Sequence, residues 1–278
     1  PVSMTLESVG NAAGLLRQPL IWSIGLAIGG FFFATAIIMI SGETFYMEPL
    51  LLLLGLALPF LAGGVYGMVK GEAFSVGEFV QSGKTYYFRI LLPALVIFFA
   101  VILTLFLLMI PLALLGAGAA ANMAALLFGV ILSIAFFTFF FYDTVAVFEE
   151  TGVFESIRRS VEFVMNNLGR VLVFYLVNIV TFLVLWFAGS FAWTALLLEK
   201  LEPLVSMSPD ELQAVMPEDI LALIGTEGIW ITAIVYAVVI VLFSVFLYAY
   251  KASFFKNHAG AVQAEQGEYD EKGRWYKY

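Results

Sequence analysis

Residues 126–160 read LLFGVILSIAFFTFFFYDTVAVFEETGVFESIRRS. The first half of this stretch is almost entirely apolar, and a single carboxylate, Asp143, interrupts it before Glu149 and Glu150. An α-helix needs about 20 mostly apolar residues to cross a bilayer. The charged segment that follows, with its Arg-Arg pair, is too polar to continue inside lipid. The stretch therefore predicts a transmembrane helix that ends in a polar corner.

The whole chain has the composition of a membrane protein. Of its 278 residues, 62% are hydrophobic and 12% are charged, whereas soluble domains carry about 25% charged residues. The net charge of −8 offers no basic patch for phosphates, so no nucleic-acid partner is expected. The absence of Cys and the single His, His258, exclude thiolate metal sites, cysteine nucleophiles and HExxH motifs. We expect no cofactor and no resident metal.

Six segments are long and apolar enough to cross a membrane as helices, the natural structure for such runs in lipid. The first residues lack the pattern of a secretory signal, so insertion is expected to depend on the spans themselves. We expect one six-helix domain over residues 1–256 and a polar cytoplasmic tail over 257–278. The six expected spans are residues 20–40, 49–69, 90–115, 121–148, 171–198 and 229–250.

Three polar segments carry apolar residues at helical spacing, with charged residues on the other side. They are residues 5–17, 75–88 and 152–168, and a helix of this kind lies in the membrane interface. Their sequences resemble one another, which predicts a repeat of three units, each an interfacial helix followed by a helical hairpin. The predicted fold class is therefore all-α: a polytopic membrane protein with six spans, three cytoplasmic amphipathic helices and an internal repeat. The clearest stripe consists of Val153, Ile157, Val161, Val164 and Leu168.

The distribution of basic residues predicts the orientation, because cytoplasmic loops are enriched in Lys and Arg. Only Lys200 of the 13 basic residues falls in a segment on the other side of the six spans. The N-terminus, the C-terminus and the interfacial helices are therefore expected in the cytoplasm, and the protein in the cell membrane. The remaining basic residues are Arg17, Lys70, Lys84, Arg89, Arg158, Arg159, Arg170, Lys251, Lys256, Lys272, Arg274 and Lys277.

The longest link on the outer side, residues 199–228, is acidic. The sequence SPDE at 208–211 places Ser208 at an N-cap and Pro209 at the first helical position, which predicts a short helix there. A solvated external loop is the preferred interpretation. The alternative is an acidic cap that attracts cations or a partner.

Asp143 is the ionisable residue that lies most clearly inside an expected span. It is six residues from the charged end of the helix, about 9 Å at 1.5 Å per residue. A carboxylate at that depth can pair with a nearby arginine and pin the span to the cytoplasmic helices, with Arg158, Arg159 or Arg170 as partner. A proton or cation relay is the alternative, since charges inside membranes are often functional. The candidate polar corner comprises Asp143, Glu149, Glu155, Arg158, Arg159 and Arg170.

Glycines at four-residue spacing predict close helix packing. One pair lies in the first expected span and a group of three leaves the second. Packing within the monomer is the preferred interpretation, with dimerisation as the alternative. These candidate packing residues are Gly25, Gly29, Gly63, Gly67 and Gly71.

The stretch FYDTVAVFEETGVFESIRRSVEFVMNNLGRVLVFYL, residues 141–176, resembles a family of polytopic membrane proteins. That family covers the membrane domain found beside glycerophosphodiester phosphodiesterases and in related archaeal and bacterial proteins. The resemblance is carried by Asp143, Glu149, Gly152, Glu155, Ser156, Arg158, Arg159 and Ser160. It implies the polytopic architecture, but it transfers no catalytic residues because the soluble phosphodiesterase domain is missing from this chain.

These observations predict a protein that is not an enzyme and that binds or organises membrane lipids or partner proteins. The expected partners are membrane lipids, with a second copy of the chain or another membrane protein as an open alternative. A transporter or channel for a small or apolar solute is the second hypothesis, although it needs a polar path through the spans. An intramembrane enzyme is the weakest, because paired catalytic groups are missing.

Overall fold

The computed structural model describes residues 2–42, 44–113, 117–205, 207, 215–265, 268–269 and 275–276. These residues are mostly helical and form two compact units. The boundary between the units falls within three long helices, α3 (Met47–Gly71), α8 (Leu168–Leu196) and α11 (Pro217–Glu265). Unit 1 comprises Pro1–Leu20, Pro59–Phe174 and Tyr248–Tyr278, and unit 2 comprises Ile21–Leu58 and Tyr175–Leu247.

Six helices among the described residues are long and apolar enough to cross a membrane. Each overlaps one expected span, so the prediction of six spans in an all-helical protein is confirmed, and the chain is a multi-pass membrane protein. The third and sixth helices extend beyond the expected spans, from Val76 in the third and over Asp219–Ala259 in the sixth. The six candidate spans are Pro19–Ile40, Met47–Gly71, Val76–Ile110, Ala125–Phe148, Leu168–Leu196 and Asp219–Ala259.

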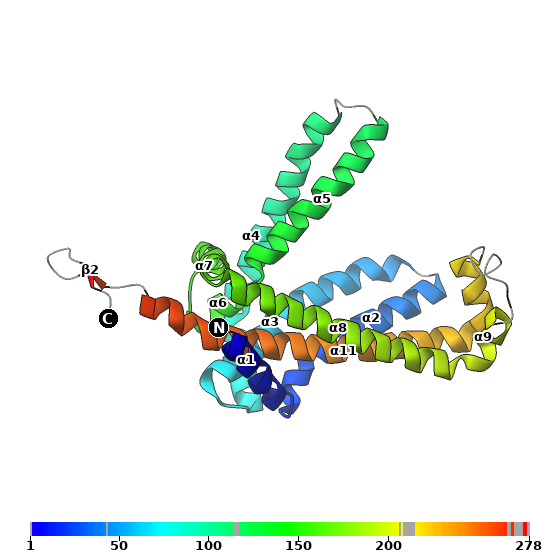
Figure 1. Ribbon diagram of the computed structural model, residues 1–278, viewed down its shortest axis with the longest axis horizontal. Helices are drawn as coiled ribbons and strands as arrows, with labels where there is room; N and C mark the ends of the chain where they lie inside the picture. The colour runs from blue at the N-terminus through cyan, green and yellow to red at the C-terminus, as the bar shows by residue number, and fades with distance from the viewer. Residues whose placement is uncertain are drawn as a thin grey trace. The chain divides into compact units, whose positions relative to one another are not determined.

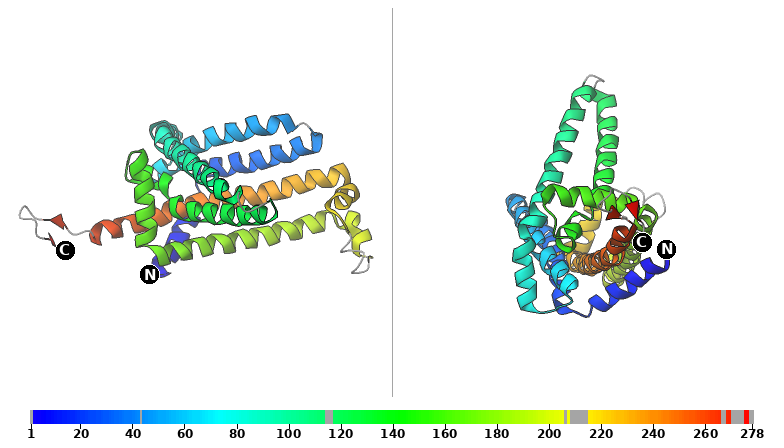
Figure 2. Two further views of the ribbon diagram at one scale, coloured as in Figure 1. Left: turned by 90° about the horizontal axis from the view of Figure 1, so that it is seen from above. Right: turned by 90° about the vertical axis from the view of Figure 1, so that its left-hand side faces the viewer.

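Unit 1 contains a long helical hairpin. Helices α4 (Val76–Ala113) and α5 (Ala117–Phe139) run side by side, as both views of Figure 2 show. The short helix α6 (Tyr142–Phe148) contacts α4 and α7 (Val153–Asn166). The unit also holds α1 (Val2–Leu15), the second half of α3, the start of α8 up to Phe174 and the end of α11 from Tyr248; Figure 1 labels these helices. Near the C-terminus, β1 (Glu268–Tyr269) pairs antiparallel with β2 (Trp275–Tyr276).

The expected fourth span is not one continuous helix. Phe141 has φ −92° and ψ 4°, and α5 ends just before it while α6 begins just after it. The break is stabilised locally, because the Thr144 hydroxyl donates a hydrogen bond to the Phe141 carbonyl at 2.8 Å. The Phe141 ring is completely buried and packs against Phe163, Phe174 and Phe254. This aromatic core fixes the place where the helix changes direction.

Helix α7 buries one member of its apolar stripe, Val164, together with residues beside the stripe. Ser156, Ser160, Phe163 and Val164 are buried, and the Ser160 hydroxyl donates to the Thr138 carbonyl of α5 at 2.9 Å. Leu168, the last member of the expected stripe, is 44% exposed at the start of α8. The reason is that lipid accepts apolar side chains as readily as a protein core does. Small residues therefore fill the close contact.

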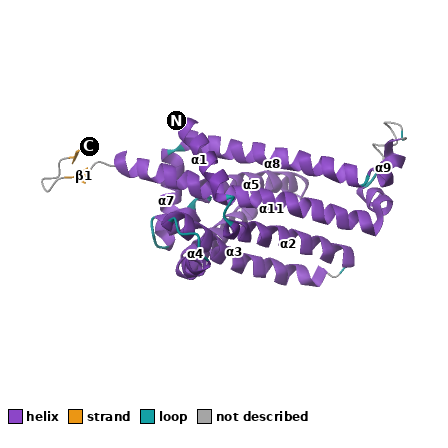
Figure 3. Cartoon of the chain, turned by 90° about the horizontal axis from the view of Figure 1, so that it is seen from below, coloured by secondary structure: helices purple, strands orange, loops and turns teal. Residues whose placement is uncertain are grey.

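Unit 2 contains η1 (Pro19–Ile21), which reaches in from unit 1, α2 (Trp22–Ser41), η2 (Thr44–Tyr46), the first part of α3, most of α8, α9 (Leu198–Val205) and the first part of α11. Figure 3 shows α2, α8 and α11 running alongside one another. Helix α9 packs on α11 through Leu197, Leu201 and Ile224, and α11 changes direction at Gly225, whose φ is 63°. The helix predicted from residues 208–211 lies outside the described residues.

The packing glycines of unit 2 bring α2 against α11. A Cβ atom on Gly25 would collide with Val245, and one on Gly29 would collide with Val241 and lie 3.0 Å from the Ala237 carbonyl oxygen. The next glycine along α2, Gly30, has nothing within 4 Å of its Cβ position. Only one side of α2 therefore requires glycine.

The packing glycines of unit 1 join α3 to α4. A Cβ on Gly63 would lie 3.3 Å from the Tyr86 Cβ, and one on Gly67 would collide with Ser82. Gly71, the third member of the pattern, has nothing within 4 Å of its Cβ position. The close approach of these two helices therefore ends before the C-terminus of α3.

We predict that Gly29→Ala destabilises the protein while Gly30→Ala does not. Both substitutions gain the same helix propensity, but only the first puts a methyl group into the α2–α11 contact, at a cost of about 1–3 kcal/mol. Thermal unfolding of the detergent-solubilised protein measures the difference. Equal melting temperatures for the two variants would show that α2 does not pack closely on α11.

Candidate functional site

A buried ion pair lies within unit 1. The Lys251 ammonium is 2.7 Å from Asp143 Oδ1 and 2.9 Å from Asp143 Oδ2, and the Tyr66 hydroxyl donates to Oδ2 at 3.2 Å. The three residues come from α6, α11 and α3, and none is more than 6% exposed. One carboxylate thus ties together three helices that are far apart in the sequence.

The local structure of α6 prepares this carboxylate. Asp143 stands in the first turn of α6, where backbone N–H groups lack helical partners, and its Oδ1 accepts the Thr144 N–H at 2.7 Å. The Lys251 ammonium also lies 4.0 Å from the centre of the Phe140 ring, where the ring's negative face attracts a cation. The two ions therefore neutralise each other, and the Thr144 N–H and the Phe140 ring make contacts that water would otherwise supply.

The partner of Asp143 differs from the one expected. Neither Arg158, Arg159 nor Arg170 pairs with it; the cation is Lys251, from a helix 108 residues along the chain. The expectation failed because it considered only arginines close in sequence. A signal was present, since the apolar residues of the sixth span resume after Lys251 with ASFF, residues 252–255.

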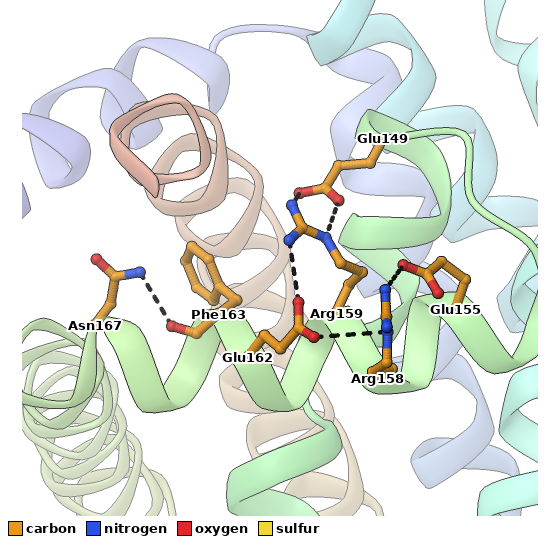
Figure 4. A network of polar contacts seen from close by, with 7 residues as sticks. All are labelled: Glu149, Glu155, Arg158, Arg159, Glu162, Phe163 and Asn167. Atoms are coloured by element: carbon orange, nitrogen blue, oxygen red, sulfur yellow. Dashed lines mark hydrogen bonds and ion pairs between the residues drawn. The ribbon is translucent and has the colours of Figure 1, made fainter. Parts of the chain in front are cut away.

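Arg158 and Arg159 belong to a separate network of ion pairs along α7, drawn in Figure 4. The Arg159 guanidinium pairs with Glu149 at 2.9 Å and with Glu162 at 3.1 Å, while Arg158 pairs with Glu155 at 2.7 Å. The acidic partners raise the pKa of both guanidinium groups, first through their hydrogen bonds to Glu149 and Glu155. The expected polar corner therefore does not form one cluster, because Asp143 pairs with Lys251 and the Arg158–Arg159 network lies apart from that pair.

Arg170 takes part in neither cluster. Its guanidinium donates a hydrogen bond to the side-chain oxygen of Asn167 at 3.1 Å, and Asn167 in turn donates to the Phe163 carbonyl at 3.0 Å. This arrangement stabilises the junction between α7 and α8.

Two further ion pairs hold the ends of α3 and α6. Lys70 bonds to Glu150, and Lys256 bonds to Glu72. Both glutamates have positive φ, 54° and 53°, and each follows the last turn of its helix. The lysine hydrogen bonds lower the pKa of Glu150 and of Glu72 below the usual value of a glutamate. Both carboxylates are therefore charged at neutral pH.

The buried side chains of Asp143, Lys251 and His258 in unit 1 each contact another group of the protein. Among the described residues, no group of three or more His, Cys, Asp or Glu side chains could hold a metal ion. His258 is fully buried, and its Nδ1 lies 2.7 Å from the Phe254 carbonyl oxygen within its own helix. Asp143 and Lys251 satisfy each other. This geometry suits a structural connection between helices.

Unit 2 contains a groove of about 430 Å³ between α2 and α11. Helix α2 contributes Phe32, Ala36, Met39 and Ile40, and α11 contributes residues between Leu221 and Ile240. Small-molecule sites in proteins occupy roughly 300–1,000 Å³. The groove is thus large enough to hold part of a lipid.

The packing glycines explain where the groove lies. Gly25 and Gly29 let α2 touch α11 at Val245 and Val241, which closes one end. One turn further on, α2 carries large side chains, and Phe33 contacts Trp230 with ring centres 5.9 Å apart. The groove lies beyond the two glycines, because its lining in α2 runs from Phe32 to Ile40.

The lining of the groove is almost entirely apolar. Of the lining residues, only Thr232 and Tyr236 carry a side-chain oxygen or nitrogen. The Thr232 hydroxyl accepts a hydrogen bond from Trp193 Nε1 and donates to the Gly228 carbonyl, both at 2.7 Å. The Tyr236 ring packs against Trp186 with centres 4.8 Å apart. The sequence analysis did not identify this groove, because apolar residues in a span can face lipid, protein or a ligand.

Comparison with known proteins identifies one related family model. It is described as a domain of unknown function, DUF7847, and it matches residues 5–258. No curated protein and no solved structure matches the chain.

We predict that Asp143→Asn lowers stability by about 3–5 kcal/mol, because it leaves the Lys251 ammonium buried without a counter-charge. Glu155→Gln removes an exposed ion pair of α7 and should leave the stability nearly unchanged, because solvent screens such pairs. Thermal unfolding in detergent measures both.

The Asp143→Asn/Lys251→Met double variant tests whether the two residues act together. It should recover much of the loss of the single variants, since it removes both buried charges. Strictly additive effects would contradict the ion pair.

Proposed function

The chain belongs to the DUF7847 family, and we propose that it is a non-enzymatic membrane protein that binds a lipid chain in the groove between α2 and α11. The observation that carries this proposal is the apolar lining of the groove. In lipid, a groove of this kind is filled by hydrocarbon, because water gains almost no hydrogen bonds there. Membrane lipid is therefore the ligand class.

The arrangement of the polar residues supports binding over transport. A transporter needs polar groups that face a path near the middle of the membrane. Here the most deeply buried charges, Asp143 and Lys251, neutralise each other and are at most 6% exposed. A relay function for Asp143 would require this pair to open, at the cost of exposing unpaired charges to an apolar interior.

We also propose that the protein lies in the cell membrane with both of its termini in the cytoplasm. The support is the concentration of basic residues in segments on one side of the six spans. In this orientation α1, the start of α4 and α7 lie at the cytoplasmic interface. The ion pairs of Glu72 and Glu150 lie on the same side.

The backbone lends support to the predicted repeat. Glu72 follows α3 and Glu150 follows α6 with nearly the same positive φ, and the next helix begins within four residues of each, at Val76 and Val153. Superposition of the two corners tests the proposal, and unrelated backbone paths on the two sides of the glutamates would contradict it. The resemblance to the membrane domain of glycerophosphodiester phosphodiesterases stays a prediction.

We predict that Ala36→Phe reduces the amount of lipid that copurifies with the protein, because the new ring occupies the groove. Ala188→Phe is the matched control, since Ala188 is an exposed residue of α8 outside the groove. Native mass spectrometry of gently extracted protein counts the bound lipids. Equal lipid occupancy in two folded variants would contradict the groove as a binding site.

We predict that cysteines introduced at Glu155 and Glu227 react from opposite sides of the membrane. Both side chains are accessible, with 43% and 74% exposure, and the chain has no native Cys. An impermeant maleimide should label Glu155→Cys only from the cytoplasm and Glu227→Cys only from outside. The reverse pattern would overturn the orientation.

A further inference from the structure

Tyr236 carries a polar group for which the described part of the chain supplies no hydrogen-bond partner. Its side chain lines the groove and packs against Trp186. Tyr236 is partly exposed, and at membrane depth no water is present to bond its hydroxyl, so a hydroxyl there favours a ligand that supplies an acceptor.

The other hydroxyl of the groove is already engaged. Thr232 accepts from Trp193 Nε1 and donates to the carbonyl of Gly228. Its hydrogen is therefore committed to the backbone, and a ligand gains little from it. Among the described residues that line the groove, Tyr236 is therefore the one whose hydroxyl hydrogen is still available to a ligand.

Its position along α11 places the hydroxyl below the membrane surface. Tyr236 is seven residues inside the expected sixth span, about 10 Å at 1.5 Å per residue. The ring contact between Phe33 and Trp230 lies on the outer side of Tyr236 along α11. A lipid headgroup at the surface does not meet Tyr236 at this depth.

We propose that the groove recognises a lipid whose apolar chain carries an oxygen acceptor, a hydroxyl or a carbonyl, and that Tyr236 donates its hydroxyl hydrogen to this oxygen. This inference rests on the proposed function and adds the ligand's chemistry. The apolar lining binds the chain, and the single hydrogen bond fixes its depth. An unsubstituted alkyl chain leaves the tyrosine hydroxyl unpaired and binds less tightly.

Three brominated probes of equal length test this proposal: a dibromo-octadecanol, a dibromo-octadecanone and a dibromo-octadecane. Bromine quenches tryptophan fluorescence, and two tryptophans are close to lining residues: Trp186 packs on Tyr236, and Trp230 follows Ile229 in α11. The wild-type protein should bind the alcohol and the ketone about five- to tenfold more tightly than the alkane, the contribution of one neutral hydrogen bond.

Tyr236→Phe should abolish this preference and leave the affinity for the alkane unchanged. Tyr46→Phe is the control, because Tyr46 is an exposed residue of η2 outside the groove and should keep the preference. Alkane binding by Tyr236→Phe verifies that this variant folds.

Three outcomes overturn the proposal. Equal wild-type affinity for all three probes excludes an oxygen-specific contact, while a preference for the alcohol without the ketone excludes donation by Tyr236. A preference that survives in Tyr236→Phe assigns the contact to another residue. If the wild-type protein binds none of the probes, including the alkane, the proposed function fails as well.

Discussion

The ion pair between Asp143 and Lys251 constrains unit 1 more than any other contact. Burying two charges costs several kcal/mol per ion, and their attraction repays this only when the geometry is close and the remaining hydrogen-bonding positions are filled. The Tyr66 hydroxyl and the Thr144 N–H fill them. Helices α3, α6 and α11 must therefore keep their relative positions, and the break at Phe141 follows because it brings the first turn of α6 to Lys251.

Unit 2 is organised by shape, because helices in lipid gain little from burying apolar surface and associate through close packing. Gly25 and Gly29 allow contact between α2 and α11, and the groove between the two helices lies beyond them along α2. The same helix pair thus supplies both a tight junction and a groove. Changes in the junction should alter the groove, which makes the glycines part of the binding site's construction.

The sequence was sufficient for the elements whose cause is local. Apolar length defines the spans, and glycine spacing pointed to the contacts of Gly29 and Gly67. It failed where the cause is a long-range contact. Lys251 was assigned to the cytoplasmic flank because the count of the span stopped one residue before it, so its pairing with Asp143 was not predicted.

Polar atoms are the informative ones in such a protein, because at membrane depth each must find a partner. The same requirement separates the two candidate sites. In unit 1 the charges of Asp143 and Lys251 satisfy each other, so this pair acts on structure. In unit 2 the groove's threonine is satisfied by Gly228 and Trp193, but Tyr236 is not satisfied by the described chain. The residue that looks least remarkable in the sequence, one tyrosine in an apolar run, is therefore the one that points to a ligand.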